Sequence, residues 1–165
     1  MNPLQVLQNH EQIFPDSCVG WGLEFILKVH DKIRLSEYPI QTARPSGLGF
    51  GREADALLRP HGIMKEDKEF ELADFQQTVE AELQAGHAPI FSIPVRFILD
   101  MSLLQVVPEA FHIFAAVRCN GAVAYLSRAH STHVLLQIRS MHDAFHSIRK
   151  VKTDYKIHCL FYAVK

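Results

Sequence analysis

The chain has 165 residues, of which 48% are hydrophobic and 21% are charged, proportions that are ordinary for a globular protein with a substantial core. Its formal net charge of -1 and pI near 6.8 argue against binding to nucleic acid or a membrane surface, because both partners require a basic patch. We expect a single domain over residues 1–165, with no nucleic acid and no membrane among its partners.

The cysteines indicate a reducing compartment. Cys18, Cys119 and Cys159 are odd in number and far apart, and no CxxC pair exists, so we expect neither a disulfide framework nor a zinc ribbon. Met1–Phe14 lacks the basic start and apolar centre of a signal peptide. No apolar stretch approaches the roughly 18 residues of a membrane span. The sequence therefore predicts a cytoplasmic protein, with export by a route that needs no cleaved signal still open.

The first half of the chain has helical patterns. Apolar residues at helical spacing over Val19–Ile33 predict a largely buried helix whose narrow solvent side is marked by Glu24, Lys28 and Asp31. Two further helices are predicted over Glu53–Arg59 and Glu71–Ala85.

Two glycine-containing segments interrupt these helices. Tyr38–Gly51, with two prolines and three glycines, predicts a loop, which we expect to border a groove beside Cys18 because its length is typical of functional loops. Gly86 is the expected C-cap of the Glu71–Ala85 helix.

After Gly86 the period changes to that of strands. Asn120-Gly121 is the strongest short hairpin signal, and Met141–Arg149 is a polar connection. Strands are predicted over Ala88–Ile93, Ala110–Arg118, Ala122–Ser127, Thr132–Ile138 and Lys156–Val164. Helices followed by antiparallel strands indicate an α+β fold, with N-terminal helices packed on a C-terminal antiparallel sheet.

Cys18 is the candidate nucleophile. It follows the turn Pro15-Asp16-Ser17 and begins a helical run, where the positive end of the helix dipole lowers the pKa of a thiol and favours the thiolate. Gln12, one short loop upstream, can donate a side-chain N–H to the oxyanion formed when that thiolate attacks a carbonyl. The alternative is that Cys18 is a small buried hydrophobic residue.

His112 is the candidate base for this nucleophile. With a two-residue turn at Asn120-Gly121, paired residue numbers sum to 241, so Ala129 lies opposite His112 and Ser127 is its diagonal neighbour on the same face. Such neighbours are roughly 7 Å apart at the backbone, within reach of an imidazole and a hydroxyl. Ser127 is the candidate for orienting the imidazole, with Asp143 as the alternative.

The remaining histidines have simpler explanations. His10, His61, His87 and His146 lie in polar or loop contexts and are expected to be solvated. His130 and His133 are three residues apart on or near a strand, so their side chains face opposite ways. No ligand set of the usual spacing is present, and we expect no metal and no other cofactor.

These residues resemble a known family. Gln12-x5-Cys18 followed by an apolar helix resembles the papain-like cysteine peptidases, above all their compact C39-like branch. Further landmarks follow in the order of that branch, at Glu53–Gly62, Leu83–Phe91 and His112–Val117. The resemblance covers about residues 8–130.

The resemblance implies a papain-like fold and a cysteine hydrolase that cleaves a peptide or amide bond of a protein or peptide substrate. It implies Cys18 as nucleophile, His112 as general base and Gln12 as oxyanion-hole side chain, while Ser127 stands where the family has an aspartate or asparagine. Two alternatives remain open on the same fold: a glutamine deamidase or acyltransferase that acts as an effector, and a binding module on a catalytically decayed scaffold.

Overall fold

The fold is described from a computed structural model of the chain. It covers residues 1–49, 51–71, 74–94, 111–119, 123–128, 138–140 and 156–164.

An antiparallel sheet forms the centre of the structure. In the described part of the chain it has six strands in the order β1-β6-β2-β3-β4-β5, and every neighbouring pair is antiparallel. The strands are β1 (Ile63–Glu71), β2 (Ile90–Pro94), β3 (Phe111–Cys119), β4 (Val123–Arg128), β5 (Ile138–Ser140) and β6 (Lys156–Val164). The last strand of the chain thus lies between β1 and β2.

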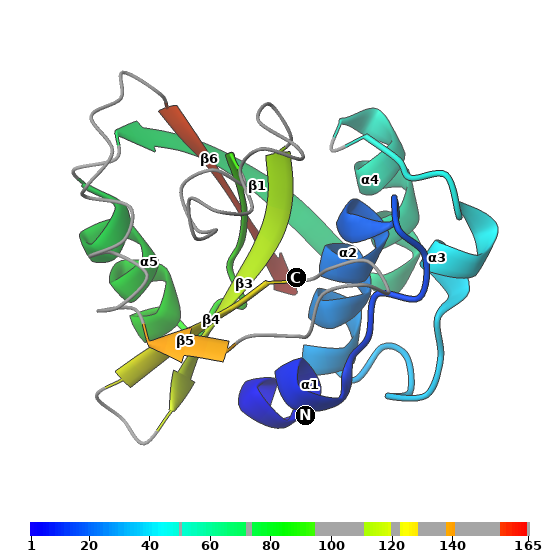
Figure 1. Cartoon of the computed structure of the whole chain (residues 1–165), viewed down its shortest axis with the longest axis horizontal. Helices are drawn as coiled ribbons and strands as arrows, with labels where there is room; N and C mark the ends of the chain where they lie inside the picture. The colour runs from blue at the N-terminus through cyan, green and yellow to red at the C-terminus, as the bar shows by residue number, and fades with distance from the viewer. Residues whose placement is uncertain are drawn as a thin grey trace, which may run out of the picture.

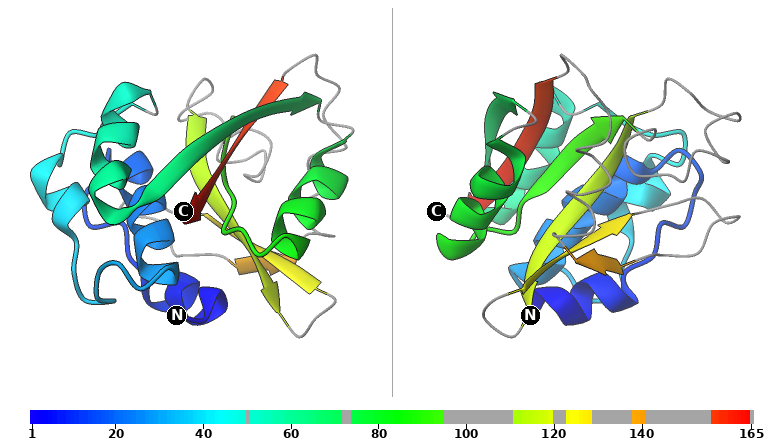
Figure 2. Two further views of the ribbon diagram at one scale, coloured as in Figure 1. Left: turned by 180° about the vertical axis from the view of Figure 1, so that it is seen from behind. Right: turned by 60° about the vertical axis from the view of Figure 1, so that its left-hand side comes forward.

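The helices cover both faces of this sheet unequally. In the described part of the chain, the helices that precede β1 gather on one side of the sheet and α5, which follows β1, lies on the other (Figure 1), as two further views show (Figure 2). The helices are α1 (Pro3–Asn9), α2 (Cys18–Val29), α3 (Pro39–Ala43), α4 (Arg52–Leu58, followed by the 3-10 turn η1, Arg59–His61) and α5 (Phe75–Gln84). Mixed helices and an antiparallel sheet confirm the predicted α+β class.

Helix α2 packs closely on the sheet. Its apolar side chains share one buried cluster with Ile113 and Ala115 of β3 and Ile90 of β2. A Cβ atom placed on Gly22 would lie 2.8 Å from Ile113 Cγ2 and 2.9 Å from Ile90 Cδ1, closer than side chains tolerate. The missing side chain at Gly22 therefore lets the helix approach the strands.

The opposite face of β3 has its own apolar contact. Because side chains alternate along a strand, Phe114 points away from the Ile113 face, and its ring stacks on that of Phe91 with the centroids 6.2 Å apart. This is the side on which α5 lies (Figure 1).

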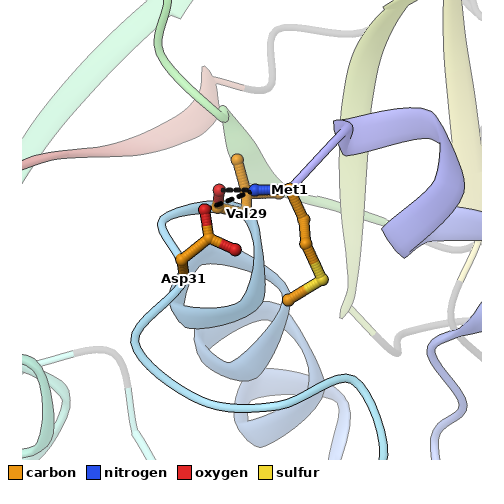
Figure 3. A network of polar contacts seen from close by, with 3 residues as sticks. All are labelled: Met1, Val29 and Asp31. Carbon is orange, nitrogen blue, oxygen red and sulfur yellow. Dashed lines mark hydrogen bonds and ion pairs between the residues drawn. The ribbon is translucent and has the colours of Figure 1, made fainter.

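The C-terminal end of α2 is closed by a left-handed residue. Asp31 has φ 56°, and Lys32 N–H donates to the Leu27 carbonyl at 2.8 Å, the pattern of a Schellman cap. The amino group of Met1 donates to the Val29 carbonyl and to Asp31 Oδ2, both at 2.8 Å (Figure 3). The segment that carries α1 is thereby tied to the end of α2, where the helix dipole favours a cation.

Several predicted boundaries differ from the observed ones. Helix α2 ends at Val29, four residues before the predicted end at Ile33. Helix α5 begins at Phe75 instead of Glu71, because Glu71 closes the unpredicted strand β1. The predicted loop at Tyr38–Gly51 contains the short helix α3.

Other predictions are confirmed. The bounds of β6 are those expected, and Gly86 follows α5 with φ 80°, as a helix-ending glycine should. Most of the predicted strand Thr132–Ile138 and the connection Met141–Arg149 lie outside the described residues.

Candidate active site

Cys18 is the first residue of α2, and the turn before it explains why the helix begins there. Ser17 N–H donates to the Phe14 carbonyl at 3.2 Å, and Trp21 N–H donates to the Ser17 carbonyl at 2.8 Å. The Ser17 hydroxyl does not cap the helix; its one proton is shared between Gln41 Oε1 at 2.7 Å and the Phe14 carbonyl at 2.9 Å. The turn is therefore fastened to another element and does not rely on its own cap.

Cys18 carries a free thiol and is partly buried. Burial raises the pKa of the Cys18 thiol, and the backbone N–H groups of Ile113, Val19 and Cys18 itself act in the opposite direction. The Ile113 N–H belongs to β3, so this strand as well as the helix start influences the pKa of the thiol. The N–H groups of Cys18 and Val19 at the helix start act to lower the thiol pKa, as predicted. Burial has the larger effect, and the pKa is raised.

The structure brings β3, at Ile113, beside the helix that carries the nucleophile. His112 precedes Ile113 in β3 and lies opposite Ile93 of β2. Along β3 its register position alternates with Ile113, so it belongs to the Phe114 face, whereas α2 packs on the Ile113 face. Cys18 packs against the apolar cluster that includes Ile113, and the Ile113 backbone N–H acts to lower the pKa of its thiol. The imidazole lies outside the described side chains, and its pairing with the thiol remains a prediction.

The predicted register of the hairpin is wrong. Cys119 lies opposite Val123 and Ala115 opposite Ser127, so paired residue numbers sum to 242 and not 241. The connection has three residues instead of two, and the slip of one position moves a residue to the other face. Ser127 consequently takes a position on the Ala115 face, away from that of His112, and the argument for its orienting role no longer holds. The alternative, Asp143, lies outside the described residues.

Gln12 lies against the turn before Cys18, but its amide hydrogens are engaged. Nε2 donates to the carbonyls of Phe14 at 2.9 Å and Pro15 at 2.8 Å. Oε1 is buried with no hydrogen-bond partner among the described residues. The expected proximity to the Cys18 turn is confirmed, while the N–H groups expected to serve an oxyanion instead brace the turn.

Gln41 is the residue of this region that the sequence did not single out. Its side chain is fully buried. Oε1 accepts from Ile13 N–H at 2.9 Å and from the Ser17 hydroxyl at 2.7 Å. Nε2 donates to Glu24 Oε2 at 2.7 Å and to the Glu11 carbonyl at 3.1 Å. All the bonding capacity of the carboxamide is used.

Glu24 connects this network to α2. Its Oε1 accepts from the N–H groups of Ile40 at 2.8 Å and Gln41 at 2.9 Å. Burial raises the pKa of Glu24, and the hydrogen bonds from Gln41 act against that rise. Glu24 and Lys28 are 0% exposed, so the predicted solvent side of the helix is wrong at both positions. In the sequence, Glu24 and Lys28 each lie between two apolar residues, and this pattern could have indicated that both are buried.

Lys28 and His10 form a second buried polar contact. Lys28 Nζ donates to His10 Nδ1 at 2.9 Å and lies 3.8 Å from the centre of the Tyr38 ring. His10 Nε2–H donates to the Trp21 carbonyl at 2.8 Å. Burial lowers the pKa of His10 to about 3 and that of Lys28 to about 8. The expectation of a solvated His10 is wrong, since its side chain is 1% exposed.

The segment after α3 lies on the side of Cys18, as expected. Gly47 has φ 90°, and a Cβ atom there would lie 2.7 Å from the Asp16 carbonyl oxygen. The loop thus touches the turn that precedes the nucleophile.

Neither protein-family models nor curated proteins give a match. Among the described residues, no three His, Cys, Asp or Glu side chains gather as metal ligands would. No helix in the same part of the chain is long and apolar enough to span a membrane.

Proposed function

We propose that the chain is a cysteine hydrolase with a papain-like fold, which cleaves a peptide or amide bond through Cys18 and His112. The observation that carries the proposal is the packing of Cys18, at the start of α2, against the apolar cluster that includes Ile113 of β3. It joins the first residue of a buried helix to the strand residue that follows the candidate base.

The mechanism begins with an ion pair. Because burial raises the pKa of the Cys18 thiol, formation of the thiolate at neutral pH depends on transfer of its proton to His112. The thiolate attacks the substrate carbonyl carbon, and the oxyanion accepts from the Cys18 backbone N–H. The imidazolium of His112 protonates the leaving amine as the C–N bond breaks, and water then hydrolyses the thioester.

Gln12 supports this chemistry by bracing the turn. Its Nε2 hydrogens are donated to Phe14 and Pro15, so it becomes a second oxyanion donor only after releasing one of these carbonyls. The same engagement favours a second candidate function, a binding module on a catalytically decayed scaffold.

A peptide mixture tests the proposal and its alternatives. The protein and its Cys18→Ser variant are incubated with a tryptic digest, and mass spectrometry identifies the products. New termini that depend on Cys18 support the hydrolase, whereas conversion of glutamine to glutamate would indicate a deamidase. An unchanged digest, together with a Cys18 that is no more reactive than a free thiol, would support the binding module.

A further inference from the structure

The side chain of Gln41 replaces a strand partner for the Gln12 segment. It donates to the Glu11 carbonyl and accepts from the Ile13 N–H, the two backbone groups that flank Gln12. A neighbouring strand would satisfy the same pair of groups in a ladder. One side chain therefore satisfies both backbone groups that flank Gln12.

The same carboxamide also reaches the residue before the nucleophile. Gln41 Oε1 accepts from the Ser17 hydroxyl as well as from Ile13 N–H. One buried oxygen atom thus connects the two ends of the turn, and Cys18 follows directly.

Gln41 is itself held by α2. Glu24 accepts from the N–H groups at the start of α3 and from Gln41 Nε2. A Cβ atom on Gly20 would lie 3.2 Å from Gln41 Cγ, so the glycine permits this close approach. The chain of contacts runs from Glu24 through Gln41 to Ser17, and it fixes the turn against the helix that carries Cys18.

We propose that Gln41 is a positioning residue for the Cys18 site, which holds the Glu11–Ser17 segment so that Cys18 packs against β3. This inference rests on the proposed function. Loss of the Gln41 carboxamide would leave its four buried partners without a hydrogen bond, which is costly. Three of these partners belong to the Glu11–Ser17 segment, and the fourth is the carboxylate of Glu24, which holds α3.

The test compares variants that disturb Gln41 with matched variants elsewhere. Gln41→Met removes the polar groups at similar length, and Gly20→Ala pushes against Gln41 without removing any hydrogen bond. Val79→Ala truncates a buried side chain of α5, and Gly49→Ala adds a methyl group where nothing lies within 4 Å. Each protein is alkylated with iodoacetamide between pH 5 and 10, and its urea midpoint is measured.

We expect Gln41→Met to move the inflection of Cys18 alkylation upward, toward the free-thiol value of about 8.5, and to slow alkylation at pH 6 about tenfold. Gly20→Ala should also move the inflection of Cys18 alkylation upward. Val79→Ala should lower the urea midpoint and leave the inflection in place, and Gly49→Ala should change neither.

An unshifted inflection in both Gln41→Met and Gly20→Ala would overturn the positioning role, and so would an equal shift in Val79→Ala. A wild-type inflection already at the free-thiol value would instead overturn the proposed function, and this inference with it. The wild-type profile alone therefore distinguishes the two failures.

Discussion

At the scale of single residues, the reactivity of Cys18 depends on a balance. Desolvation disfavours the thiolate, and three backbone N–H groups favour it. These amides come from the helix start and from β3, so the balance depends on how α2 is seated on the strand. A catalytic Cys18 needs the additional charge of a protonated imidazole to be a thiolate at neutral pH.

The register of the hairpin makes a prediction for Ser127. Because Ser127 pairs with Ala115 and not with a position on the His112 face, Ser127→Ala should leave the pH profile of Cys18 alkylation within twofold of wild type at every pH. The measurement is the rate of iodoacetamide alkylation. A shift as large as that in His112→Ala would show that the hydroxyl does orient the imidazole.

Sequence reasoning succeeded for some of these residues and not for others. The turn signal and the apolar run were sufficient to place Cys18 at a helix start. The partners of Gln41 include Ile13, 28 residues away, and a contact of that separation leaves no periodic trace in a single sequence. Ser127 was misplaced because Asn120-Gly121 signals a turn but does not fix the number of residues in it.

At the scale of elements, the packing of α2 on the sheet decides where Cys18 lies. A Cβ atom on Gly22 would meet Ile113, the same residue whose backbone N–H acts to lower the pKa of the Cys18 thiol. Movement of the helix away from β3 would therefore disturb stability and the site together.

Gly22→Ala tests this coupling. The added methyl group would lie 2.8 Å from Ile113 Cγ2, and overpacking of this kind costs about 1–3 kcal/mol, against a gain of about 1 kcal/mol from helix propensity. We expect a net destabilisation in urea and a changed alkylation profile. Gly49→Ala, with open space around it, is the control. An equally stable Gly22→Ala protein with a wild-type profile would contradict the close seating of α2.

Some helices and strands could be predicted from sequence patterns, and others could not. Apolar spacing predicted α2, and alternation predicted β6 with its observed bounds. Strand β1 (Ile63–Glu71) escaped prediction because its charged sequence is typical of a solvated segment. It lies at the edge of the sheet that the described residues form, and charge at such an edge discourages pairing with other chains.

At the scale of the whole molecule, the buried His10 links the fold to pH. Its pKa is lowered from 6.5 to about 3 in the folded protein, so the unfolded chain binds the proton more readily between these values. The stability contributed by neutral His10 is complete above pH 6.5 and is lost as the pH falls through this window. Between pH 7 and pH 5 this amounts to about 2 kcal/mol.

A His10→Gln variant separates this contribution from others. Glutamine keeps a donor for the Trp21 carbonyl and does not titrate, so the loss of unfolding free energy from pH 7 to pH 5 should be about 2 kcal/mol smaller than in wild type. Glu24, with its raised pKa, acts in the opposite sense and is common to both proteins. Parallel pH dependences from urea unfolding would contradict the buried neutral imidazole.

The central claim is that Cys18 and His112 act together, and the most direct test is the alkylation rate of Cys18 by iodoacetamide against pH in wild type and His112→Ala. The account predicts a wild-type inflection well below the free-thiol value of about 8.5, which moves upward in the variant as the imidazolium is lost. An inflection at or above that value in both proteins would contradict the account and leave Cys18 as a buried structural thiol.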